Sequence, residues 1–169
     1  MFAVSSDAEY GYYPGAISIY SLSQNKILNT FKNYGDTSPR SMAYKDGDYL
    51  YVGNTIQGGL GTTPKEKNAK IFKINYKTGE IIKSISLDTQ GVADLEFTPD
   101  GKLYALYGDG IARINPDDLK VEEYKQYSTK YGSMINELEY YDGYFIATIN
   151  GKIYHIDPKD LSRDFITTG

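Results

Sequence analysis

A short β-rich unit recurs four times along this chain of 169 residues. Each copy has an isoleucine-rich strand followed by a turn that begins with serine, asparagine or aspartate; the turns occupy residues 21–26, 75–80, 115–120 and 157–162. Their first residues are 54, 40 and 42 positions apart (75−21, 115−75, 157−115). A β-rich repeat of about 40–45 residues is typical of a β-propeller, in which each repeat forms one antiparallel sheet called a blade.

The last three copies contain further strand signals in the same order. An Asp-Gly pair, which tolerates the positive φ of a tight hairpin, precedes a second apolar strand in each copy. An apolar segment before that pair and another after the serine, asparagine or aspartate turn complete four strands, named A to D in chain order. The sequence therefore predicts an all-β propeller with about fifteen antiparallel strands and no helix. One domain over residues 1–169 is expected, with blades at about 1–32, 40–87, 91–127 and 133–168.

The first predicted blade is incomplete, because its pattern contains strands B, C and D without strand A. Three explanations remain open: a piece of a propeller of six to eight blades, which we favour, a compact ring of four blades, or copies that complete a ring together. Exposed sheet edges pair readily with other strands. We therefore expect further blades of a parent chain, or a homo-oligomer, to complete the ring.

The predicted core consists of strand residues that recur on the apolar face of the last two blades. These residues are Leu95, Leu103, Leu106, Ile111, Ile114, Leu138, Ile146, Ile153 and Ile156.

Composition excludes several classes of function. The net charge of −4 and the absence of basic runs argue against nucleic acid as a partner, and no apolar run approaches the about 20 residues of a membrane span. There is no cysteine, and His155 is the single histidine. It aligns with Lys73 and Arg113 on strand C, so we expect it to face solvent. Neither catalytic residues nor a metal site or resident cofactor are assigned, and residues 1–6 do not look like a signal peptide.

Two long loops suggest a binding site. In a propeller the B–C and D–A loops share one face, here called the loop face, and the B–C loops expand to residues 7–15 and 54–70 in blades 1 and 2. Tyrosines beside a carboxylate suit a sugar or a protein ligand, although the rings can equally pack the loop down. The candidate ligand-binding residues are Glu9, Tyr10, Tyr12, Tyr13, Arg40, Gln57, Gly58, Gly59 and Asp94.

Carboxylates on the innermost strands allow a second interpretation. Glu9, Asp94 and Glu137 can together bind a divalent cation, as in a propeller-type carbohydrate lyase or a lactonase-like hydrolase. The structural alternative is that these carboxylates accept hydrogen bonds from the backbone of neighbouring blades.

The repeat resembles known propeller families. Its Asp-Gly turn, the Leu-Tyr-Ala-Leu strand at 103–106 and the Ile-x-x-Ile-Asn-Pro strand end at 111–116 are similar to the repeats of YVTN, quinoprotein-like and WD40-like propellers. The loops at 9–15 and 57–61 resemble those of bacterial extracellular propeller modules. This resemblance implies a non-catalytic module that binds a ligand or protein on its loop face. It also implies a place in a larger bacterial surface or secreted protein.

Overall fold

The computed structural model describes residues 2–5, 16–31, 37–56, 68–127, 135–149 and 152–166, and these ranges contain fifteen strands in four antiparallel sheets. Blade 1 consists of β1 (Phe2–Ser5), β2 (Ala16–Ser21) and β3 (Lys26–Phe31). Blade 2 consists of β4 (Thr37–Ala43), β5 (Tyr49–Ile56), β6 (Ala69–Asn75) and β7 (Ile81–Leu87). Blade 3 consists of β8 (Val92–Phe97), β9 (Leu103–Tyr107), β10 (Gly110–Ile114) and β11 (Val121–Gln126). Blade 4 consists of β12 (Ile135–Tyr141), β13 (Tyr144–Ile149), β14 (Lys152–Ile156) and β15 (Arg163–Phe165).

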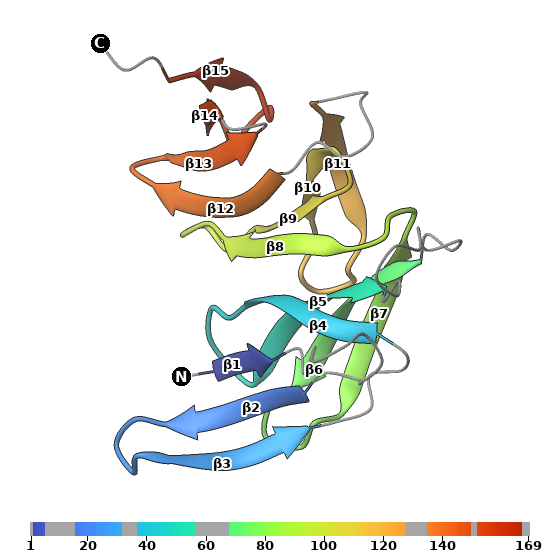
Figure 1. The fold of residues 1–169 in the computed structure, drawn as a ribbon, viewed down its shortest axis with the longest axis vertical. Coiled ribbons are helices and arrows are strands. Elements are labelled where there is room, and N and C mark those ends of the chain that lie inside the picture. Colours follow the sequence, from blue (N-terminus) through green and yellow to red (C-terminus); the bar gives the residue numbers. More distant parts are fainter. Residues whose placement is uncertain are drawn as a thin grey trace.

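The four sheets fan out from a common inner side. Figure 1 shows β4, β8 and β12 on that side, and blades 1 and 4 at opposite ends of the molecule. Strand β4 packs against β8, and β8 packs against β12, as the inner strands of consecutive blades do in a propeller. The predicted fold is confirmed, including the three described strands of blade 1. Within the described ranges there is no helix of a length and apolarity that could cross a membrane.

The recurring C–D turns are built by local hydrogen bonds. The side-chain Oδ1 atoms of Asn115 and Asp157 accept the backbone N–H two residues later, at 2.9 and 2.8 Å. Leu119 and Leu161 then adopt positive φ values of 58° and 55°. This conformation costs a residue with a Cβ about 1–2 kcal/mol. Both leucine side chains are fully buried, and burial worth about 1.5–3 kcal/mol offsets that cost.

The core lies between the blades rather than within one sheet. Each interface is apolar, as between Ile17 of blade 1 and Leu50 of blade 2. Seven of the nine predicted core residues are buried, and Ile146 is half-buried. The prediction for Ile153 is wrong, because its side chain is 47% exposed. Ile71 and Ile111 occupy the same place in their repeats and are fully buried. The next blade covers those two residues, whereas no described strand covers Ile153.

Candidate functional site

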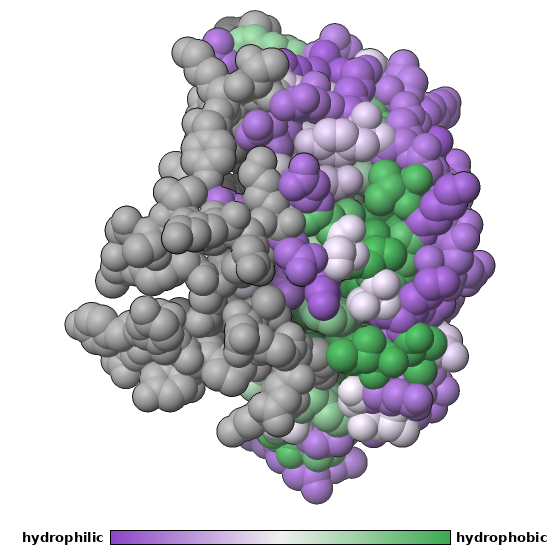
Figure 2. Space-filling view, turned by 90° about the vertical axis from the view of Figure 1, so that its right-hand side faces the viewer, coloured by the Kyte–Doolittle hydropathy of each residue, from purple (hydrophilic) through white to green (hydrophobic). Residues whose placement is uncertain are grey.

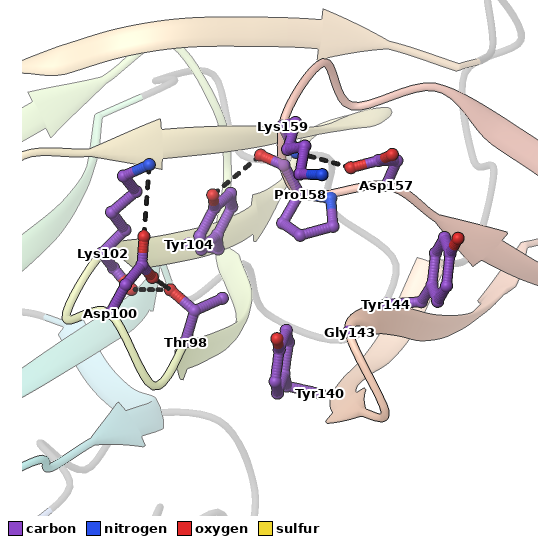
Figure 3. Close-up of a pocket in the computed structure, with 10 residues that line it drawn as sticks. All are labelled: Thr98, Asp100, Lys102, Tyr104, Tyr140, Gly143, Tyr144, Asp157, Pro158 and Lys159. Carbon is purple, nitrogen blue, oxygen red and sulfur yellow. Dashed lines mark hydrogen bonds and ion pairs between the residues drawn. The ribbon is translucent and has the colours of Figure 1, made fainter.

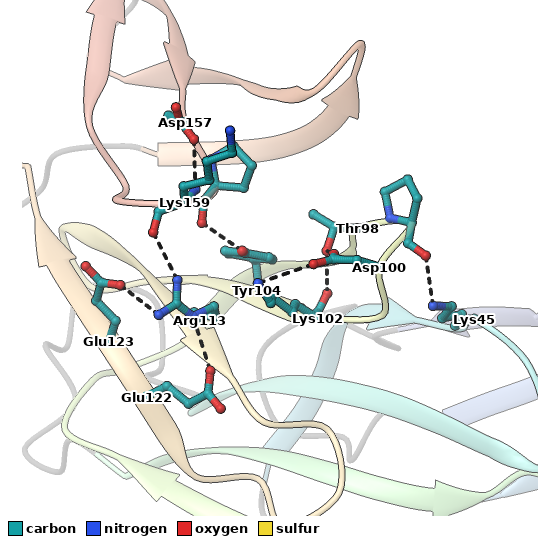
Figure 4. Close-up of polar contacts among 12 residues, drawn as sticks. Lys45, Thr98, Asp100, Lys102, Tyr104, Arg113, Glu122, Glu123, Asp157 and Lys159 are labelled. Atoms are coloured by element: carbon teal, nitrogen blue, oxygen red, sulfur yellow. Dashed lines mark hydrogen bonds and ion pairs between the residues drawn. The ribbon is translucent and has the colours of Figure 1, made fainter.

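Blades 2 and 3 each contain a tyrosine at the same place in strand B, where the blade packs against the next one. The Oη of Tyr51 donates to the carbonyl oxygen of Pro116 at 2.8 Å, and the Oη of Tyr104 donates to that of Pro158 at 2.8 Å. Figure 4 shows the second of these bonds. Burial, and then the charge of Asp117, raises the pKa of Tyr51 to about 12, so its phenol remains a donor at neutral pH. The strands of one blade are thereby fixed to the C–D turn of the next.

Removal of either hydroxyl is expected to weaken its joint. Tyr51→Phe and Tyr104→Phe should each lower the free energy of unfolding by about 0.5–1.5 kcal/mol, because each removes one hydrogen bond to a carbonyl oxygen of the next blade. Tyr141→Phe is the matched control, since the Tyr141 side chain is 71% exposed. Urea unfolding measures the effect, and two variants as stable as the control would contradict this role.

A basic residue of strand C contacts the same turns. Lys73 Nζ donates to the carbonyl oxygen of Pro116 at 3.0 Å, and Arg113 Nη1 donates to that of Lys159 at 3.2 Å. Arg113 is also paired with Glu122 and Glu123 (Figure 4). His155 is the third residue at this place. It is exposed, as predicted, and stacks on Tyr144 with 5.5 Å between ring centroids.

Cavities accompany both joints on the face that carries the A–B and C–D turns. One of about 350 Å³ lies between blades 3 and 4, where Tyr104, Tyr140 and Tyr144 line it together with Lys102 and Lys159 (Figure 3). One of about 300 Å³ lies between blades 2 and 3 and is lined by Tyr49, Tyr51 and Lys73 among others. The candidate site predicted from the sequence lies on the opposite face, and these cavities were not predicted. The tyrosines at matching places of two repeats were the signal that could have indicated them.

On the inner strands, Ser41 and Asp94 link consecutive blades. Ser41 Oγ donates to the carbonyl oxygen of Val92 at 3.1 Å. The carboxylate of Asp94 accepts the backbone N–H of Leu95 at 2.9 Å and that of Leu138 at 2.8 Å. Burial is the main reason that the pKa of Asp94 is raised, although these two bonds act against the rise. The structure therefore shows Asp94 in the backbone-binding arrangement that the sequence analysis gave as its structural alternative.

Glu96 is an unusual carboxyl group at the joint of blades 3 and 4. Burial, followed by the charges of Glu139 and Asp94, raises its pKa from 4.5 to about 7. The protonated form is thus the one that the fold favours. Its contribution to stability is complete below the unfolded pKa of 4.5 and is lost as the pH rises through about 7.

Glu96→Gln is therefore expected to stabilise the protein at high pH only. At pH 8 the gain should be roughly 1–2 kcal/mol, allowing for screening by solvent, and near pH 4 it should vanish. Thermal unfolding at the two pH values measures the difference, with the exposed Glu80→Gln as control. A gain of equal size at both pH values would show that ionisation of Glu96 is not its cause.

The remaining predicted site residues divide between described and undescribed positions. Arg40 is exposed and lies within β4, where the register shifts between Pro39 and Ser41. Seven others, Glu9, Tyr10, Tyr12, Tyr13, Gln57, Gly58 and Gly59, lie outside the described residues, so the loop-face site stays a prediction. In the part of the chain that is described, no three His, Asp or Glu residues are grouped to hold a metal ion. Because Glu9 lies outside that part, the cation site also stays a prediction.

The face of the blade-4 sheet that points away from blade 3 is exposed. We call it the blade-4 outer face. Cross-strand register places eight residues on it, Glu139, Tyr141, Tyr144, Ile146, Thr148, Ile153, His155 and Asp164, and alternation along β12 adds the exposed Glu137. Tyr144 and Ile153 are 46% and 47% exposed. In blade 3 the places of Ile146 and Ile153 are held by Tyr104 and Ile111, which blade 4 buries almost completely. An apolar surface of this kind is a candidate interface.

Apolar residues are also exposed on the outer D strands. Figure 2 shows apolar side chains among polar ones on the side of the molecule that the view presents. Ile27 and Leu28 of β3 and Ile81 and Ile82 of β7 are between 42% and 60% exposed. In each strand the two apolar residues are consecutive and have a polar residue on either side. They supply matched controls for tests of the blade-4 outer face.

Comparison with known proteins supports the fold. No family model matches the chain. A relative, "Eukaryotic translation initiation factor 3 subunit I" of the yeast Vanderwaltozyma polyspora, is 32% identical over 120 residues, which are 68% of this chain and 33% of that protein. Solved propellers are similar over nearly the whole chain. The Neurospora crassa Pan2 WD40 domain gives a TM-score of 0.64 at 12% identity, covering 96% of this chain and 50% of that one. The RRP9 WD40 repeats give 0.67 at 13%, covering 97% and 53%.

These similarities establish a WD40-like β-propeller fold. The chain spans about a third of the curated relative and about half of each solved propeller. Of the three propeller types that the repeats resemble, the similarities support the WD40-like type. The expectation of an extracellular or cell-surface location in a bacterium is wrong, because the matching relative is a eukaryotic translation initiation factor subunit. The wrong expectation came from the resemblance of two loops to bacterial extracellular modules, and surface loops vary more freely than the strands they connect.

Proposed function

We propose that the chain is a non-catalytic WD40-like propeller module that binds a protein partner. The observation that carries this proposal is the blade-4 outer face, a sheet surface on which Ile146 and Ile153 hold places that the next blade buries in blades 2 and 3. Burial of such a surface is the main source of affinity in protein association. No resident cofactor is part of the proposal.

The charges around this face favour a partner with a basic rim. Tyr144, Ile146 and Ile153 form its apolar centre, and Glu137, Glu139 and Asp164 stand around them. Two copies that met through this face would bring the carboxylates of one near those of the other, which is unfavourable. Further blades of a parent chain or a different protein with lysine or arginine at its rim would fit better.

Quantitative affinity purification tests this proposal. The double variant Tyr144→Ser, Ile153→Ser should lose the partners that the wild type retains. The control Ile27→Ser, Ile82→Ser removes apolar side chains of similar exposure from the outer strands and should retain them. Unfolding of both variants in urea verifies that they remain folded. Equal recovery of every partner by both variants would remove the blade-4 outer face from the proposal.

A translation initiation assembly is a second candidate setting. It rests on the 32% identity to subunit I of eukaryotic translation initiation factor 3. A tagged form of the protein is expected to sediment with initiation complexes in a sucrose gradient of cell extract. Recovery only near the top of the gradient, with the marker of those complexes deeper, would contradict this setting without affecting the module proposal.

A ligand on the loop face remains part of the proposal. Glu9, Tyr10, Tyr12, Tyr13, Arg40, Gln57, Gly58, Gly59 and Asp94 would contact a sugar or a protein there. Glycan and peptide arrays screened with the wild type and with Tyr12→Ala, Tyr13→Ala distinguish these ligands. We expect the double variant to lose binding, and binding that it retains unchanged would refute this site.

A further inference from the structure

We propose that the cavity between blades 2 and 3 binds the side-chain carboxylate of an acidic residue in a partner protein, with Lys73 as its cationic contact. The cavity has a volume of about 300 Å³, and Tyr49, Tyr51 and Phe97 line it with aromatic rings. It lies at a different joint from the blade-4 outer face. The inference therefore rests on the proposed role as a module that binds proteins, but not on that face.

Lys73 places an ammonium group in this cavity that is almost removed from solvent. Its side chain is 10% exposed, and Nζ donates to the carbonyl oxygen of Pro116 at 3.0 Å. Nζ also lies 4.8 Å from the ring centroid of Tyr49 and 5.6 Å from that of Tyr51. Its described ion-pair partner, Asp117, is 3.9 Å away, which exceeds hydrogen-bond distance, and the Asp117 side chain is 95% exposed. A cation buried to this extent is costly unless an anion lies close to it.

In blade 3 the corresponding cation is neutralised by its own sheet. Arg113 holds the place of Lys73, and it pairs with Glu122 at 3.1 Å and with Glu123 at 3.0 Å (Figure 4). Both carboxylates belong to β11, the D strand of that blade. The guanidinium group is thus compensated without any ligand.

The D strand of blade 2 offers no such carboxylate. Lys73 lies opposite Lys83 of β7, as Arg113 lies opposite Glu123 of β11. The residue before Lys83 is Ile82, so the second carboxylate of blade 3 has no counterpart either. The position that neutralises the cation in blade 3 therefore adds positive charge in blade 2. An anion in the cavity would supply the missing partner, in surroundings where water screens the attraction less than at an open surface.

Charges at the rim select the kind of anion. Lys45, Asp46 and Asp117 line the cavity together with Lys73, so two cations face two carboxylates. Lys45 is already a donor to the carbonyl oxygen of Pro99, at 3.1 Å. The two aspartates would repel a doubly charged phosphate group more strongly than a singly charged carboxylate. They also favour a lysine or arginine beside the acidic residue of the partner, so we expect an acidic–basic pair to be the preferred sequence.

Titration with blocked dipeptides tests this site. The probe is acetyl-glutamyl-arginyl-amide, and the NMR signals of Lys73 and Tyr49 report its binding. We expect saturable shifts of both signals with a Kd of about 1 mM or tighter. The glutaminyl analogue should bind about tenfold more weakly or worse, because it lacks the charge, and the phosphoseryl analogue should also bind more weakly. No shift with the probe, equal binding of the glutaminyl analogue or tighter binding of the phosphoseryl analogue would overturn the proposal.

Two chain variants remove the free charge in different ways. Lys73→Met should abolish dipeptide binding. Lys83→Glu leaves Lys73 in place and copies the carboxylate that blade 3 presents to Arg113, so it should weaken binding about tenfold or more. Lys26→Glu makes the same change of charge on blade 1 and should leave binding unchanged. Urea unfolding verifies that each variant is folded, and if Lys73→Met is not, Lys83→Glu alone decides. Unweakened binding by a folded Lys73→Met or Lys83→Glu would refute the site.

One further variant separates this site from the blade-4 outer face. The double variant Tyr144→Ser, Ile153→Ser should bind the dipeptide as the wild type does. Loss of dipeptide binding in that variant would show that the signal does not come from the cavity, and would overturn the inference. Failure of the dipeptide with every form of the chain would refute this site alone, because partner recovery through the blade-4 outer face is measured separately.

Discussion

Truncation of Leu106 or Ile114 to alanine is expected to lower the free energy of unfolding by roughly 2–5 kcal/mol. Both side chains are fully buried, Leu106 against blade 4 and Ile114 against blade 2. Each truncation leaves a cavity between two sheets that cannot close without moving both. Chemical denaturation measures the loss, and Ile82→Ala, at an exposed site, is the control. Midpoints unchanged in both core variants would contradict this packing.

A single added methyl group is expected to be almost as damaging at Gly110. A Cβ on this residue would overlap the backbone carbonyl oxygen of Lys125 and lie 3.0 Å from the Cα of Gln126. Both contacts are with the backbone of the paired strand β11, which cannot move aside as a side chain can. Gly110→Ala should therefore cost roughly 3 kcal/mol or more, at the upper end of the effects of overpacking.

Gly47→Ala is the matched control for this prediction. Gly47 has a φ of 73°, and no atom lies within 4 Å of an added Cβ. Only the backbone conformation opposes alanine there, at about 1–2 kcal/mol. Thermal unfolding compares the two variants, and a smaller loss at Gly110 than at Gly47 would refute the close approach of β10 and β11.

Most of the fold could be predicted from the repeat. Spacing of the turns and alternation within the strands predicted the sheets because both are local properties of the chain. The failure at Ile153 has a different origin. Its repeat position is buried in blades 2 and 3 only because another blade follows, and a pattern averaged over repeats cannot represent the end of an arc. Burial of that position is a property of the neighbouring sheet rather than of the residue.

The site was less accessible to sequence reasoning. The bonds from Tyr51 and Tyr104 to proline carbonyls depend on residues 65 and 54 positions away, and only the packed blades bring them together. Asp94 was identified as important from its place on the inner strand, but sequence alone left open whether it would bind a ligand or backbone. Its two backbone partners emerge from the register of β8 and β12.

Comparison of Ile111→Ala with Ile153→Ala in the purified chain tests most directly whether the four blades form an open arc, in which no blade covers the blade-4 outer face. The two isoleucines share one repeat position and differ in whether a described blade follows. The open arc predicts a loss of roughly 2–5 kcal/mol in the free energy of unfolding for Ile111→Ala and less than about 1 kcal/mol for Ile153→Ala. Equal, large losses in the two variants would show that the blade-4 outer face is covered within the chain itself, and would contradict the open arc.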